Sequence, residues 1–228
     1  MKKVLILCLV ILTACNSKPK TPFQVLKSVK TKDGVKLDVQ VNSRISKKEM
    51  VDIASYIKSD SSQYNNLQVD FILPGNSYAN KAGVTVYATA AYHDKTIVSP
   101  ADTVADKNKN FLSFEFVGFT PEKARELLSL DPKELAGKQI IGKFIDDATK
   151  TISLIAEDKQ ENNQLYILEL DSAGTVVSAI APMAVTDKGV RKMVVSQQGD
   201  YMTLKDSILT MYSSTDVDKP YRSIKQSR

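Results

Sequence analysis

The chain has few of the residues that build metal cages, disulfide frameworks or sugar-stacking surfaces. Its 228 residues include one histidine, two cysteines and no tryptophan. A structural zinc site needs about four Cys or His ligands, and a disulfide framework needs more cysteines than this chain has. Both are therefore excluded, and no cofactor is predicted. The lack of tryptophan weakens a sugar-binding interpretation, although nine tyrosines leave it open.

The residues that are present have the proportions of a globular protein. Hydrophobic residues make up 43%, charged residues 25%, and the net charge is +5. These values exclude a polytopic membrane protein, a collagen-like chain and wholesale disorder. The length allows one large domain or two small ones. Lysines of the first half are dispersed and not interleaved with aromatic residues, so we predict no nucleic-acid partner.

Residues 1–14 have the pattern of an export signal. Positive charge at Lys2 and Lys3 precedes an apolar run at residues 4–12, which is shorter than the roughly 20 residues that a membrane-spanning helix needs. The alternative is a buried first element of the fold, but Lys20 and Pro22 separate the run from the body of the chain.

The motif Leu12-Thr13-Ala14-Cys15 resembles the lipobox of bacterial lipoprotein precursors. The resemblance implies a diacylglyceryl thioether on Cys15 and cleavage between Ala14 and Cys15. The alternative is an ordinary secretory cut that leaves Cys15 as an unmodified thiol, and it requires four positions to match by chance.

The neighbouring residues agree with a lipid anchor. Cys8 would leave with the signal peptide, so Cys15 would be the single cysteine of the mature chain. Residues 15–22 are predicted to be a polar tether. In enterobacterial lipoproteins an Asp after the cysteine favours the inner membrane. Asn16 is not Asp, so we expect the outer membrane, facing the periplasm, with the inner membrane as the alternative.

The first part of the body predicts an α+β domain at residues 23–119. Alternation at residues 24–31 and 35–42 around Asp33-Gly34 predicts a β-hairpin. Ser46 and Glu49 form a capping box that opens a helix at residues 47–59. Further strands are expected at 67–73, where Pro74-Gly75 should stop the strand, and at 84–92 and 111–116. The predicted fold is an antiparallel sheet with one covering helix.

The second part predicts a β-rich module at residues 120–215. Short helical segments between 118 and 137 open it, and short strands then recur at about 8–12 residues, which is typical of an antiparallel barrel or sandwich. Residues 216–228 are expected to be a polar tail. The strands are expected near 139–145, 151–157, 164–170, 175–181, 190–196, 200–205 and 208–213. The body resembles uncharacterised bacterial envelope lipoproteins at residues 44–50 and 71–75, a resemblance that implies no activity.

Two patterns contain residues that are used in hydrolytic enzymes. Ser55 and Lys58 match the Ser-x-x-Lys pair of β-lactamase-like enzymes, but the Ser-Asp-Asn and Lys-Thr-Gly motifs that accompany it are absent. His93 stands beside Asp94 without a Gly-x-Ser-x-Gly motif. With no complete catalytic motif, we predict that the chain is not an enzyme.

One acidic segment opens like a calcium-binding loop at Asp106. An EF-hand then needs Gly and Glu where this chain has Phe111 and Val117, so we expect a polar turn before a strand and no metal. The other acidic groups expected in loops are Asp146 with Asp147 and Asp216 with Asp218.

We therefore predict a lipid-anchored bacterial envelope protein that acts as a noncatalytic interaction or structural module, with the membrane and an envelope protein as partners. A second hypothesis is that the C-terminal module is a barrel that carries a small apolar molecule, since eight-stranded barrels can hold one small ligand. A third is an enzyme that uses Ser55 and Lys58. A fourth is an inhibitor, immunity or phage-exclusion lipoprotein.

Overall fold

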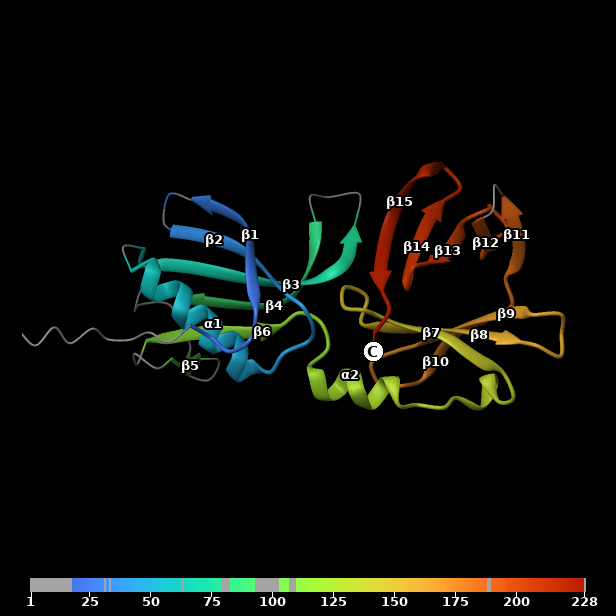
Figure 1. Cartoon of the computed structure of the whole chain (residues 1–228), viewed down its shortest axis with the longest axis horizontal. Helices are drawn as coiled ribbons and strands as arrows, with labels where there is room; N and C mark the ends of the chain where they lie inside the picture. Colours follow the sequence, from blue (N-terminus) through green and yellow to red (C-terminus); the bar gives the residue numbers. More distant parts are fainter. Residues whose placement is uncertain are drawn as a thin grey trace, which may run out of the picture.

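The computed structural model describes residues 18–227, apart from residues 31, 33, 63, 79–82, 93–102, 107–109 and 188–189. The chain has an α+β fold of two halves that follow one another along the long axis of the molecule (Figure 1). Each half has its own hydrophobic core. Among the described helices, none is long and apolar enough to cross a membrane.

The N-terminal half is a sheet with the helix α1 packed on one face. Its strands lie in the order β1-β2-β3-β4-β6-β5. The predicted hairpin of β1 and β2 is confirmed. One pair departs from the antiparallel prediction, because α1 connects β2 to β3 and the two strands run parallel. The elements are β1 (Phe23–Lys30), β2 (Gly34–Val41), α1 (Lys47–Asp60), β3 (Asn66–Tyr78), β4 (Gly83–Tyr92), β5 (Thr103–Ala105) and β6 (Phe111–Phe116).

The start of α1 is fixed by the predicted capping box. Ser46 Oγ accepts a hydrogen bond from the Glu49 backbone N–H at 3.3 Å, and Glu49 Oε2 accepts one from the Ser46 N–H at 2.8 Å. Thr21 Oγ1 also donates to Glu49 Oε1, at 2.8 Å. The face of α1 that is buried against the sheet consists of Met50, Val51, Ile53, Ala54, Ser55 and Ile57.

The C-terminal half is a sandwich of two antiparallel sheets with α2 on its outer side (Figure 1). The four-stranded sheet of β7–β10 lies between α2 and the other sheet and contributes to a hydrophobic cluster on each of its faces. Ile152, Leu154 and Ala156 belong to the cluster formed with α2, whereas Phe144 and Ile155 belong to the cluster between the sheets. The elements are α2 (Pro121–Leu128), the 3₁₀ helix η2 (Lys133–Leu135), β7 (Gln139–Asp146), β8 (Thr151–Asp158), β9 (Gln164–Leu170) and β10 (Val176–Ile180), followed by β11 (Met183–Asp187), β12 (Val190–Val194), β13 (Tyr201–Lys205), β14 (Ile208–Ser213) and β15 (Asp216–Lys225).

Of the two predicted architectures for the second half, a sandwich or a closed barrel, the structure has the sandwich. The sheets do not close on each other: β7–β10 form one sheet, and β11–β15 are part of another. The space between them is filled by side chains, including Phe144, Leu209 and Met211, which are at most 5% exposed. The carrier hypothesis therefore loses the barrel chamber on which it depended.

Two predicted boundaries are wrong for one shared reason. The strand β3 does not stop at Pro74-Gly75, and residues 216–225 form the strand β15 where a polar tail was expected. Each extension is the partner of the other, since Ser77 pairs with Ser223 and Tyr78 with Arg222. The left-handed backbone of Gly75, with φ of 81°, lies where the register shifts. One sheet consequently runs through both halves.

The capping box makes part of the stability dependent on pH. Hydrogen bonds from the Ser46 backbone and side chain, and from Thr21, lower the pKa of Glu49. A lowered pKa in the folded state contributes stability above the unfolded-state pKa of about 4.3, and this contribution disappears as the pH falls.

We expect Glu49→Gln to lower the free energy of unfolding by about 0.3–1 kcal/mol at pH 7, and by less at pH 3, as measured by urea denaturation. The exposed Glu134 provides the control Glu134→Gln for the loss of one negative charge. An equal deficit of Glu49→Gln at both pH values would contradict the role of its carboxylate.

Candidate functional site

A buried ion pair joins the two halves. Arg44 lies between β2 and α1, and Asp147 follows β7. Arg44 Nη1 donates to Asp147 Oδ1 at 2.7 Å, and Arg44 Nη2 donates to Asp147 Oδ2 at 2.6 Å. The side chain of Asp147 is fully buried, and that of Arg44 is 13% exposed. Two parallel charge-assisted hydrogen bonds fix both the distance and the relative orientation of the segments that carry them.

The segment that leads into the second half completes the surroundings of Asp147. The Phe119 N–H donates to Asp147 Oδ1 at 3.0 Å, and the Phe119 carbonyl accepts from Arg44 Nη1 at 3.0 Å. Gly118 is required beside them, because a Cβ there would lie 2.0 Å from Asp147 Oδ1. The ion pair therefore also holds the connection between the halves.

Tyr87 supports the arginine from the N-terminal sheet. The Arg44 guanidinium lies over the Tyr87 ring, 5.1 Å from its centroid, a cation–π geometry. The Tyr87 hydroxyl donates to the Ile45 carbonyl at 3.1 Å. Burial raises the pKa of Tyr87, which the charge of Arg44 opposes. The phenol therefore stays neutral and keeps its role as donor.

The preceding residue forms a second ion pair next to the junction, between the two sheets of the C-terminal half. Asp146 Oδ2 accepts a hydrogen bond from Arg222 Nη1 of β15, and Oδ1 accepts from the Ala148 N–H at 3.1 Å. Adjacent carboxylates thus bind arginines from two different segments. We expected Asp146 and Asp147 in a loop. Asp146 ends β7 and Asp147 begins the turn after it, and both are buried structural acids.

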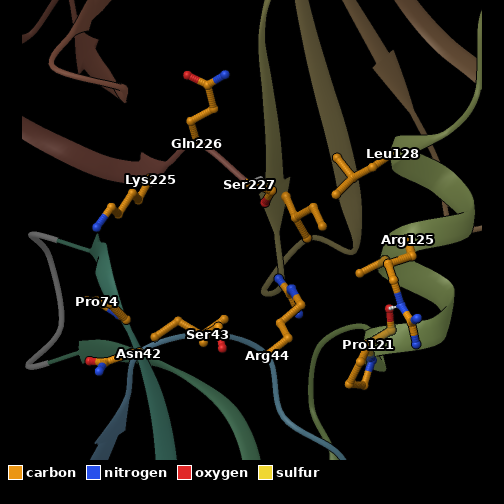
Figure 2. Close-up of a pocket in the computed structure, with 13 residues that line it drawn as sticks. Asn42, Ser43, Arg44, Pro74, Pro121, Arg125, Leu128, Lys225, Gln226 and Ser227 are labelled. Atoms are coloured by element: carbon orange, nitrogen blue, oxygen red, sulfur yellow. Dashed lines mark hydrogen bonds between the residues drawn. The ribbon is translucent and has the colours of Figure 1, made fainter.

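A cleft of about 470 Å³ lies next to this junction (Figure 2). Its volume is within the range of small-molecule binding sites. Lys225 and Gln226 lie on one side in Figure 2, Arg125 and Leu128 lie on the other, and Arg44 is between them. The lining residues are Asn42, Ser43, Arg44, Leu73, Pro74, Pro121, Ala124, Arg125, Leu128, Ile145, Lys225, Gln226 and Ser227.

The charged side chains of this lining are all cationic. Arg44 is neutralised by Asp147 behind it. Arg125 contacts Glu122 at 3.3 Å in an exposed pair, which is weak because water screens it. Arg125 and Lys225 add further basic groups to a described lining that includes no acidic residue, while Leu73, Leu128 and Ile145 supply apolar surface. The arrangement can bind a group that combines negative charge with an apolar part.

The two residues of the Ser-x-x-Lys pattern, Ser55 and Lys58, have different hydrogen-bond partners. The buried Ser55 hydroxyl donates to Asp106 Oδ2 at 3.4 Å. The Lys58 ammonium group donates to the Tyr64 carbonyl and lies 5.7 Å from the centre of the Tyr92 ring. Burial lowers the pKa of Lys58, against the opposing charge of Asp106. The hydroxyl therefore faces a carboxylate rather than the lysine that the hydrolase hypothesis needs.

Asp106 is a buried acceptor at the turn between β5 and β6. Its Oδ1 accepts from the Asn110 N–H at 2.8 Å, and its Oδ2 accepts from the Tyr92 hydroxyl at 3.0 Å. These bonds tie the turn to the core. Within the described ranges, no group of three or more His, Cys, Asp or Glu side chains is arranged to hold a metal ion.

The remaining sequence candidates are placed as follows. Ala14, Cys15 and His93 lie outside the described residues. Asp216 and Asp218, expected in a loop, are exposed residues of the strand β15.

Comparisons of the chain with protein-family models, with curated proteins and with solved structures found no match.

Loss of Arg44 is expected to destabilise the fold. Arg44→Ala leaves the buried Asp147 carboxylate without its charge partner, and breaking a buried pair in this way costs about 3–5 kcal/mol. Urea denaturation should show this loss, whereas Arg125→Ala, a change at an exposed side chain, should stay within about 0.5 kcal/mol of the wild type.

The double variant Arg44→Met/Asp147→Leu removes both charges and should recover most of the stability lost in Arg44→Ala. If Arg44→Ala were as mild as Arg125→Ala, the ion pair would not be what holds the halves together.

Proposed function

We propose that this chain is a lipid-anchored bacterial envelope protein that acts by binding and not by catalysis, with the cleft between its halves as the binding site. The lipobox-like motif ending at Cys15 supports the anchor. Outer-membrane attachment facing the periplasm follows from Asn16, by the same resemblance. The binding partner carries a negative charge and reaches the cleft from the periplasm.

The observation that carries the binding role is a cleft with walls from both halves, whose described lining includes basic residues from three segments and no acidic residue. Arg44 comes from the N-terminal half, Arg125 from α2 and Lys225 from β15. Sites of this kind, at junctions between structural units with a few polar groups among apolar ones, are the usual places for ligand binding. A volume of about 470 Å³ suits a small molecule or the end of a polypeptide.

The anchor has a direct test with a matched control in the same chain. Cells grown with an alkyne fatty acid should incorporate it into the wild type, and Cys15→Ser should abolish the label because the acylated sulfur is gone. Cys8→Ser should retain the label, since Cys8 would be removed with the signal peptide. Detection is by in-gel fluorescence after coupling to an azide dye. Label that persists in Cys15→Ser would contradict the proposal.

The cleft can be tested by photo-crosslinking in intact cells. A benzophenone amino acid at Asn42, in the cleft lining, should form an adduct that is missing when the group is placed at Val177, an exposed residue of β10. Mass spectrometry identifies the adduct.

Reversal of the cleft charge provides the specificity control for this crosslink. Arg125→Glu/Lys225→Glu should abolish the Asn42 adduct, because the cationic groups would be replaced by anionic ones. Lys150→Glu/Lys159→Glu, which alters the net charge equally at exposed positions away from the cleft lining, should leave it unchanged. An adduct that is insensitive to the cleft reversal would show that the cleft does not bind an anionic partner.

The inhibitor, immunity or exclusion hypothesis stays a prediction that is compatible with this proposal, since such proteins also act by binding. No feature of the described residues favours it over other binding roles.

A further inference from the structure

The charged residues in the segment that follows the proposed lipid anchor are all basic. Residues 15–32 contain five lysines and no acidic residue. The lysines are Lys18, Lys20, Lys27, Lys30 and Lys32. All five are exposed in the structure. Lys18 and Lys20 lie in the tether, Lys27 and Lys30 in β1, and Lys32 between β1 and β2.

The same strand exposes apolar side chains. Val25, Leu26 and Val29 are 44%, 46% and 41% exposed. A register shift between Val25 and Lys27 leaves Leu26 as an extra residue beside the Lys27–Asp38 pair. Leu26, Lys27 and Val29 therefore lie on the face of the sheet opposite α1, because Val25 and Ser28 pair with the core residues Val39 and Leu37.

The strand β1 is also an edge of the sheet. Among the described strands it pairs with β2 alone, and in Figure 1 it lies in the half of the molecule away from β7–β14. Lysines on an edge strand discourage pairing with another protein strand. The mixture of exposed lysine and apolar side chains instead matches an anionic bilayer surface, where lysines contact headgroups and short apolar side chains enter the interface.

We propose that β1 lies on the surface of an anionic membrane, with Leu26 and Val29 in the headgroup region and Lys27, on the same face, on anionic lipids. The inference rests on the proposed anchor at Cys15. At no more than about 3.5 Å per residue, the eight residues from Cys15 to Phe23 keep β1 within about 28 Å of the lipidated cysteine. The anchor and β1 then form a two-point attachment that sets the orientation of the protein.

The absence of tryptophan from the chain makes a single introduced tryptophan a clean reporter. The native lipidated protein with Leu26→Trp is reconstituted in vesicles of phosphatidylglycerol and phosphatidylethanolamine that contain brominated acyl chains. We expect about twofold or greater quenching relative to unbrominated vesicles, because side chains at such an interface lie roughly 5–10 Å deep. Val177→Trp, on β10, should show no quenching.

Charge dependence completes the test. Lys27→Glu in the Leu26→Trp background should reduce the quenching, as should vesicles of phosphatidylcholine alone. Absence of quenching at Leu26→Trp in protein that is anchored, as shown by its intact lipid mass, would overturn the proposal without affecting the anchor. A blue-shifted but unquenched tryptophan would also overturn it, because another protein chain would then cover β1. If the lipid mass is missing, the proposed function itself fails.

Discussion

The ion pair of Arg44 and Asp147 determines how the two halves face each other. Asp147 has no access to solvent, so its charge has to be compensated whenever the halves are in contact. The bidentate geometry, the Phe119 N–H and the close approach of Gly118 leave little rotational freedom at this point. A cleft whose walls belong to separate hydrophobic cores can keep its shape only if such a contact holds those walls at a fixed separation.

The shared sheet complements the ion pair. The strand β3 pairs with β2 in its first part and with β15 in its last part, so one hydrogen-bonded sheet extends from one half into the other. Arg222, on β15, binds Asp146, next to the carboxylate that binds Arg44. Backbone pairing and side-chain charge thus act on the same short region. These two contacts bring basic residues from three segments into one cleft lining.

Local signals predicted much of this fold. Turn residues and the alternation of apolar and polar residues are local patterns. They predicted the β1–β2 hairpin, the capping box of α1 and most strands of the second half. The missed strands β5, β11 and β15 depend on their neighbours. β15 contains Pro220 and several charged residues, and is a strand because β14 and β3 supply its hydrogen bonds.

The site was beyond the reach of such signals, because Arg44 and Asp147 are 103 residues apart. One compositional hint did exist. Only five of the 31 basic residues are arginines, and two of these five form the buried pairs, where a planar guanidinium is better suited than an ammonium group.

The position of Lys225, Gln226 and Ser227 in the cleft wall has a consequence for biogenesis. These residues are the last of the described chain to be synthesised. The N-terminal sheet has its own core and can assemble while the rest of the polypeptide is still emerging. The cleft wall, by contrast, is complete only after β15 has docked on β3. A chain that is still being synthesised therefore lacks part of the cleft on which the proposed binding depends.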